Sequence, residues 1–262
     1  MTLLSGLTYE TFKQTAEDSF PRGLWFSPDE SRMVMSGVNT HRAYSYTGTP
    51  GSISTFTYDS KSFLFTTEGT APAAVAFNPD GTLMYAALDV GGGPANDGIY
   101  QYDLTAWDVT TAVYSTKRLL IGLPVGLHFK PDGTEAYVVE SASVKQYTLS
   151  SAWDISAGTL TATFSVAGQT GQVAGVTLDS TGTIMLVLGG DNDTIFEYTL
   201  TAWDLSSASY TSDSLSVNAQ DSIPTDIHLT DSKLYMVGQV QDRVHQWARA
   251  VGGWRVGMVS MG

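Results

Sequence analysis

The segment GLHFKPDGTEAYVVE, residues 126–140, contains two short runs of apolar, aromatic and β-branched residues joined by Pro-Asp-Gly. Runs of this kind are typical of half-buried strands, and Pro-Asp-Gly is typical of tight turns. The segment therefore predicts two antiparallel strands connected by a turn.

The same pattern occurs five times along the chain. Its apolar anchor residues, each followed by a turn, are Phe26, Phe77, Phe129, Leu178 and Leu229, at intervals of 51, 52, 49 and 51 residues. Each unit continues with a third apolar run, ending at Tyr46, Tyr102, Tyr147, Tyr198 or Trp247, and most units contain a fourth. Four short strands repeated at this period predict an all-β fold, a single five-bladed β-propeller of four-stranded blades.

The two ends of the chain share the last blade in this interpretation. The fifth unit shows only three strands, and residues 7–15 look like a fourth strand without a blade of its own. Asp18 and Pro21 precede the first strand of unit one at the same spacing as Asp221 and Pro224 precede that of unit five. We therefore predict that an N-terminal strand closes the ring.

The sequence divides into a propeller, residues 1–250, and a C-terminal tail, residues 251–262. Three arginines and no acid occur from Arg243 onward. The tail is either an extra strand on the last blade or a basic, apolar docking segment for an acidic neighbour or a second copy. The docking interpretation, which would suit a purely architectural protein, depends on Trp254, Arg255 and Met258.

Composition restricts the function in several ways. The 262 residues include 13 basic and 26 acidic ones, a formal charge of −13, which argues against a nucleic-acid-binding or anionic-membrane surface. The absence of cysteine excludes disulfides, thiol catalysis and thiolate zinc sites. No apolar stretch is long enough to span a membrane, and the N-terminus lacks the pattern of a signal peptide. We expect no membrane insertion and no signal peptide.

The repeat resembles known families. Phe-x-Pro-Asp-Gly-Thr before an apolar strand is similar to the YVTN and NHL class of bacterial propeller repeats. YTLSSAWDIS (147–156) and YTLTAWDLS (198–206) resemble a repeat of predicted structural proteins of tailed phages, especially marine ones. Unit one departs from it, with Thr49-Pro-Gly-Ser-Ile in place of Ala-Trp-Asp, and unit five ends before that motif. The resemblance implies a binding or scaffolding module.

Our favoured hypothesis is a non-enzymatic phage virion component, such as a tail-fibre, tail-tip or capsid-surface protein, that recognises the host. Such a protein is made in the host cytoplasm and acts on the virion. Its partners would be other virion proteins or a host cell-surface glycan or protein, it would be present in several copies, and it would need no cofactor. The alternative is a bacterial propeller enzyme, lactonase- or hydrolase-like, or a ligand-binding protein with a polar site in the central channel.

The Trp-Asp pairs have a structural explanation. Asp108, Asp154 and Asp204 each lie shortly before a Thr or Ser in a tight link. In such a link the carboxylate accepts backbone N–H bonds while the tryptophan covers the blade edge. The same tryptophans would form an aromatic shelf for sugar rings if they lie on one rim.

Two histidines occupy one position of the repeat. His128 and His228 fall in the first strand of units three and five, where a propeller lines its channel. We expect them to be packed near the axis, because the equivalent residues of the other units are not metal ligands. The acidic loops 89–97 and 191–193 could offer oxygens to calcium but lack the 12-residue loop pattern, so polar turns are the favoured interpretation and no metal site is predicted.

The loops between the second and third strands vary in length and are polar. Variable loops on one rim of a regular scaffold are where specific surfaces form, although any of these residues could also be a plain solvated turn. The residues predicted to bind a glycan or protein there, hereafter the rim residues, are Asn39, Thr40, His41, Asn96, Asp97, Asp191, Asn192, Asp193, Gln241 and Asp242.

Overall fold

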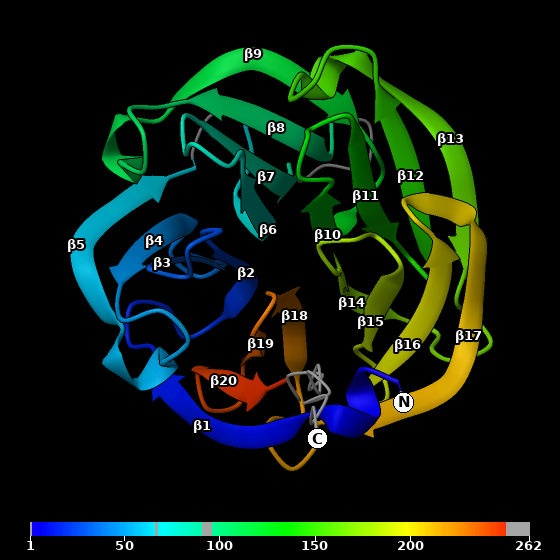
Figure 1. The fold of residues 1–262 in the computed structure, drawn as a ribbon. Helices are drawn as coiled ribbons and strands as arrows, with labels where there is room; N and C mark the ends of the chain where they lie inside the picture. Colours follow the sequence, from blue (N-terminus) through cyan, green and yellow to red (C-terminus); the bar gives the residue numbers. More distant parts are fainter. Residues whose placement is uncertain (1, 66–67, 91–95, 250–262) are drawn as a thin grey trace, which may run out of the picture.

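The computed structural model describes residues 2–65, 68–90 and 96–249. Five four-stranded antiparallel sheets surround a central axis (Figure 1). In four of them neighbouring strands follow one another along the chain, and the fifth combines the N-terminal strand with three C-terminal ones. The predicted all-β, five-bladed propeller is confirmed. Among the described residues no helix is long and apolar enough to cross a membrane.

Each blade is a meander that runs from the axis outward. The innermost strands are β2 (Pro21–Phe26), β6 (Ala71–Phe77), β10 (Pro124–Phe129), β14 (Val173–Leu178) and β18 (Pro224–Leu229). The second strands are β3 (Arg32–Gly37), β7 (Leu83–Asp89), β11 (Glu135–Glu140), β15 (Ile184–Gly189) and β19 (Lys233–Gly238). The third strands are β4 (Arg42–Thr47), β8 (Gly98–Asp103), β12 (Ser143–Leu149), β16 (Thr194–Thr201) and β20 (Arg243–Ala248). The outer strands are β5 (Thr57–Leu64), β9 (Val113–Leu120), β13 (Gly158–Ser165), β17 (Asp204–Ser216) and β1 (Thr8–Gln14). Short 3₁₀ turns are η1 (Leu4–Gly6), η2 (Ile53–Thr55), η3 (Val109–Thr111) and η4 (Ile155–Ala157).

The N-terminal strand closes the ring, as the sequence predicts. β1 pairs with β20 in antiparallel register, from Thr8 opposite Ala248 to Gln14 opposite Arg243 (Figure 1). The preceding turn η1 stands where the other blades have the connection to their outer strand. The chain therefore begins within its last blade.

Strand burial follows from how blades pack. The inner strands lie between two neighbouring sheets, so both of their faces are buried; β7 is buried at five consecutive positions. An outer strand has one face in solvent, and β9 alternates accordingly between exposed and partly buried residues. This difference explains why the inner strands are almost continuously apolar and the outer ones alternate.

Side-chain hydrogen bonds join most neighbouring blades at one repeat position. The third-strand residue Gln101 accepts from the N–H of Ile155 in the next blade at 3.1 Å, and Gln146 accepts from Leu205 at 2.9 Å. The two remaining bonds of this kind involve the closing blade: Gln246 accepts from Ile53 at 2.7 Å, and Glu197 accepts from Leu4 at 2.8 Å. Because these N–H groups are buried, each bond satisfies a donor that would otherwise destabilise the junction.

The predicted tail residues Trp254, Arg255 and Met258 lie outside the described residues. The division into a propeller of residues 1–250 and a tail therefore stays a prediction.

Candidate functional site

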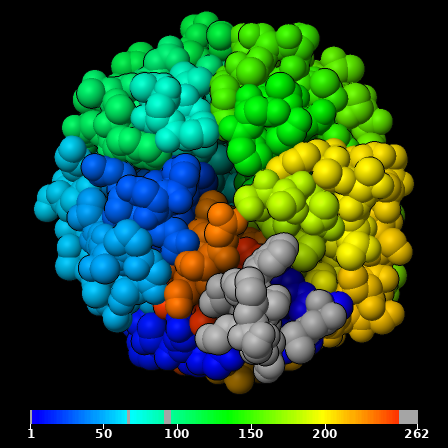
Figure 2. Space-filling view, viewed as in Figure 1, coloured from blue at the N-terminus to red at the C-terminus, as the bar shows by residue number. Residues whose placement is uncertain are grey.

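The propeller has two different faces. Because every innermost strand runs in the same direction, the turns that follow these strands and the Trp-Asp connections lie on one face, the turn face. The second-to-third-strand loops and the links between blades lie on the other, the linker face. Figure 2 looks onto the turn face, where the five blades surround a central hollow.

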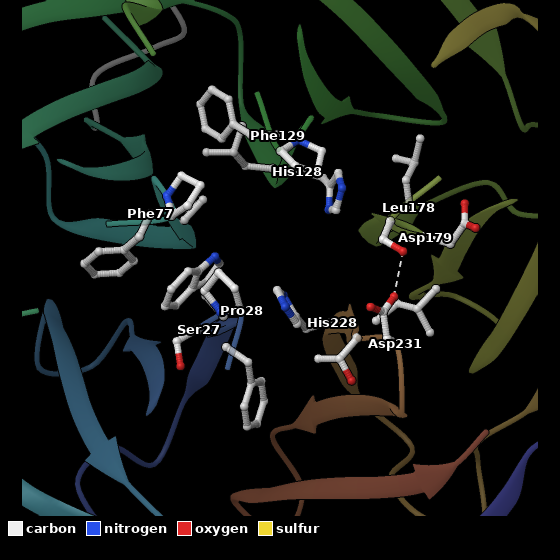
Figure 3. Close-up of a pocket in the computed structure, with 18 of the residues that line it drawn as sticks. Ser27, Pro28, Phe77, His128, Phe129, Leu178, Asp179, His228 and Asp231 are labelled. Carbon is white, nitrogen blue, oxygen red and sulfur yellow. Dashed lines mark hydrogen bonds between the residues drawn. The ribbon is translucent and has the colours of Figure 1, made fainter. Parts of the chain in front are cut away.

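A cavity of about 320 Å³ opens at the centre of the turn face, and we call it the central bowl. Its wall is formed by the ends of the innermost strands, by the turns that follow them and by two of the Trp-Asp connections. The phenylalanines and tryptophans of the wall are Trp25, Phe26, Phe77, Phe129, Trp153 and Trp203. Figure 3 shows the side chains converging from all five blades.

The Trp-Asp tryptophans are held by the glycines of the Pro-Asp-Gly turns or their equivalents. Trp203 donates its backbone N–H to the carbonyl of Gly182 at 3.0 Å, and its indole covers that glycine so closely that an added Cβ would come within 2.2 Å. The pairs of Trp107 with Gly81 and of Trp153 with Gly133 are equivalent. The tryptophan position of the repeat therefore has a structural function in each of these blades.

The aspartates of the motif act as the sequence predicts. Asp154 accepts from the N–H of Ser156, and Asp204 accepts from that of Ser206, at 3.1 and 3.0 Å. The tryptophans, however, do more than cover a blade edge. Trp153 and Trp203 line the bowl, whereas Trp107 stacks on Trp25 with a centroid distance of 5.6 Å and lies outside the bowl's lining. All three Trp-Asp connections lie on the turn face, and two of their tryptophans line the bowl.

His128 and His228 point into the bowl from β10 and β18 (Figure 3). The ring of His128 is nearly parallel to that of Trp203, at 6.4 Å and 13°, and His228 meets the ring of Trp25 edge-on at 6.3 Å. The prediction that the two histidines lie near the axis is confirmed. Neither imidazole hydrogen-bonds to any residue that the structure describes.

Both imidazoles are neutral at pH 7. Burial lowers the pKa of His128 to about 4, with an opposing effect of the Asp179 charge. Burial and, to a smaller extent, the neighbouring His128 together lower the pKa of His228 to about 3. Each neutral ring has one N–H donor and one nitrogen acceptor, so the bowl offers two donors and two acceptors to an occupant.

The charged groups of the bowl are carboxylates whose oxygens are used locally. Asp179 accepts from the N–H groups of Thr183 and Ile184 at 2.8 and 2.9 Å. Asp231 accepts from the hydroxyl of Ser180 at 2.6 Å, across the boundary between two blades (Figure 3). No lysine or arginine occurs among the described residues that line the bowl. The bowl therefore has no cation for an anionic ligand.

The innermost strands of neighbouring blades pack closely against each other along the channel. A Cβ on Gly23 would lie 2.6 Å from the Cα of Ala74, and one on Gly175 would lie 2.4 Å from an oxygen of Asp226. Asp226 is fully buried there and accepts from the N–H of Leu24 at 2.9 Å, and burial raises its pKa. A second, smaller cavity of about 130 Å³, lined by residues near the start of the innermost strands such as Arg22 and Pro224, lies on the linker face.

The structure places all ten rim residues on the linker face, opposite the bowl. They belong to the loops after β3, β7, β15 and β19 and do not converge on one point. Several of them stabilise their own loops: buried Asp97 accepts from Val90 N–H, Asp191 accepts from Gly171 N–H, and Thr40 N–H donates to Asp18. Their role in binding stays a prediction. No group of three or more potential metal-ligating side chains occurs in the described ranges.

Comparisons with known proteins support the fold. No protein-family model matches the sequence, and no curated protein matches it. The β-propeller domain of Cps50 (Swd1) from Myceliophteria thermophila superimposes with a TM-score of 0.55 at 10% identity, over 93% of this chain and 100% of that one. A protein from Lactobacillus plantarum gives 0.56 at 15% identity over 88% of this chain and 67% of that one. A functionally unknown protein from Desulfotomaculum acetoxidans gives 0.53 at 15% identity over 86% and 67%. At these identities the likeness extends to the β-propeller fold alone.

Proposed function

We propose that this chain is a non-enzymatic binding module whose ligand enters the central bowl. The observation that carries the proposal is the pair of neutral imidazoles, His128 and His228, whose nitrogens face an aromatic cavity and bond to no described residue. Concave, mainly apolar cavities with a few convergent polar groups are the usual form of a ligand site.

The same pair is poorly arranged for catalysis. A histidine that acts as a general base is normally oriented by a third group, and it titrates near the working pH. Asp179, a carboxylate of the bowl, accepts from the N–H groups of Thr183 and Ile184 through Oδ1 and from the hydroxyl of Thr181 through Oδ2. The depressed pKa values of His128 and His228 leave both rings weak bases. These features favour binding over the lactonase- or hydrolase-like alternative.

The proposal extends to a phage virion, where the module would recognise the host or hold another virion protein in several copies. This extension rests on the resemblance of the Trp-Asp-Ile-Ser repeat at residues 147–156 to phage structural proteins. A module with the bowl on one face and the polar rim residues on the other could bind a ligand and a neighbouring virion protein at the same time.

A thermal-shift screen of neutral, cationic and anionic small molecules tests the binding function, with His128→Phe as the counter-screen. We expect compounds that stabilise the wild-type chain and fail to stabilise the variant. A screen without such compounds, or turnover of δ-gluconolactone that the variant loses, would contradict the proposal. Density-gradient fractionation of the native source with mass spectrometry tests the virion placement: stoichiometric banding with particles supports it, and recovery only with soluble protein refutes it.

A further inference from the structure

We infer that the ligand of the central bowl is an uncharged sugar ring, which stacks on the tryptophan wall and bonds through its hydroxyl groups to His128 and His228. This inference rests on the proposed binding function and specifies its ligand. It follows from three properties of the described residues: a rigid aromatic wall, unpaired neutral donors and acceptors, and the absence of a lining cation.

The aromatic wall is rigid before any ligand arrives. Trp153 and Trp203 are pinned by backbone bonds to Gly133 and Gly182 at 2.9 and 3.0 Å and by close packing on those glycines. Trp25 is supported from behind by Trp107 and by Phe77, whose ring centroid is 4.8 Å away. Fixed aromatic surfaces lower the ordering cost of binding and suit the apolar C–H face of a sugar ring.

The polar groups of the bowl argue against a purely apolar occupant. An occupant without hydroxyl or similar groups would displace water from the nitrogens of His128 and His228 and leave them unsatisfied in an apolar cavity, which is costly. A hydroxyl group is both donor and acceptor, like a neutral imidazole. A ring with an apolar face and hydroxyls around its edge matches both parts of the bowl.

Charge restricts the sugar to an uncharged one. Phosphate and carboxylate groups are normally bound by arginine or lysine, and the described lining of the bowl contains neither. An anionic sugar would also meet the carboxylates of Asp179 and Asp231. For an amino sugar, both oxygens of Asp179 and one oxygen of Asp231 already accept hydrogen bonds within the protein, from Thr181, Thr183, Ile184 and Ser180.

The size of the bowl suits a single ring. Its volume of about 320 Å³ is at the small end of the range of roughly 300–1,000 Å³ found for ligand pockets. The bowl is lined by the turns after the innermost strands and opens on the turn face. A terminal residue of a longer glycan could therefore enter while the rest of the glycan stays in solvent.

The test is a titration of the full chain followed by the histidine ring signals in ¹H–¹³C NMR. The probes are the methyl glycosides of glucose, galactose, mannose and N-acetylglucosamine, with N-acetylneuraminic acid as an anionic sugar and indole as a flat ring without hydroxyls. We expect at least one neutral glycoside to shift the signals of His128 and His228 and leave those of His41 and His245 unchanged. The two comparators should bind more weakly by at least about tenfold.

Variants identify the contacts. His128→Phe keeps a ring against Trp203 but removes the donor and acceptor, and should weaken glycoside binding about tenfold. Trp203→Phe should also weaken it, whereas Trp247→Phe, on β20 and outside the lining, should stay within about twofold of wild type. Near-UV circular dichroism confirms that each variant is folded.

The outcomes separate the two claims. Binding of indole or N-acetylneuraminic acid without any glycoside would overturn the sugar inference and leave a binding module. Binding of none of the probes would also overturn the sugar inference. Hydrolysis of δ-gluconolactone that His128→Phe abolishes would overturn the proposed function itself.

Discussion

Replacement of Gly182 by alanine tests whether the glycine of the turn and the tryptophan of the Trp-Asp motif form one structural unit. Gly182 has a φ of +69°, in the left-handed region, where a residue with a Cβ is disfavoured by about 1–2 kcal/mol. The added Cβ would also lie 2.2 Å from Cδ2 of Trp203, so the indole must move. Overpacking of this kind costs about 1–3 kcal/mol, which gives a total destabilisation of about 2–5 kcal/mol.

The assay is urea unfolding followed by tryptophan fluorescence, together with thermal unfolding. For a chain of this size each kcal/mol lowers Tm by about 2–4 °C, so we expect a decrease of at least about 4 °C. Gly168→Ala is the matched control, because a Cβ at Gly168 would meet nothing within 4 Å. The reasoning would be refuted if Gly182→Ala and Gly168→Ala had the same stability within about 0.5 kcal/mol.

Two further predictions concern ring closure and pH. Gln246→Ala leaves the buried N–H of Ile53 without its partner at 2.7 Å and should lower the free energy of unfolding by about 1–3 kcal/mol. The control Gln241→Ala, in an exposed loop, should change it by less than about 0.5 kcal/mol. Equal urea midpoints for the two variants would show that the Gln246–Ile53 bond does not stabilise the ring closure. The folded-state pKa values of His128 and His228 are about 4 and about 3, below the ordinary 6.5 of an unfolded histidine. Below pH 6.5 the unfolded chain therefore binds protons that the folded chain does not bind. The free energy of unfolding is greatest above pH 6.5 and falls as the pH falls below it, by up to about 1.4 kcal/mol per pH unit for each ring. Urea unfolding at pH 7, 6 and 5 should therefore show a shallower pH dependence for the double variant His128→Phe/His228→Phe than for wild type, and parallel curves would refute the neutral state of these rings.

The hydrogen bonds between blades could be predicted from the sequence only in part. Gln101, Gln146 and Gln246 recur at one position of the third strand and could be recognised as a pattern. Their partners are backbone N–H groups of the following blade, and Leu4 takes the corresponding place opposite Glu197. Which groups meet there depends on the angle between adjacent sheets, so the pairing could not be predicted from the repeat alone.

The central bowl depends on tertiary structure in the same way. The sequence placed His128 and His228 at equivalent positions near the axis, and it identified the repeated tryptophans. It did not indicate that Trp153 and Trp203 line a cavity with these histidines while Trp107 lies behind Trp25. The sequence signal that could have located the bowl is the tryptophan that recurs shortly after the third strand. Because the third strand and the innermost strand of a blade run in the same direction, this tryptophan and the end of the innermost strand lie on the same face.

The sequence by itself determined the all-β class, the number of blades and the closing strand, because these depend on local periodicity and on a spacing of about 50 residues that any reader of the chain can measure. Only the tertiary structure decided that the polar rim residues and the bowl lie on opposite faces, that the bowl is separate from the smaller cavity on the linker face, and that burial lowers the pKa values of His128 and His228. The physical reason is that the cavity, and the burial that shifts these pKa values, form where five blades meet at one axis. The residues that meet there are separated along the chain by whole blades, so no local sequence pattern shows which of them are in contact.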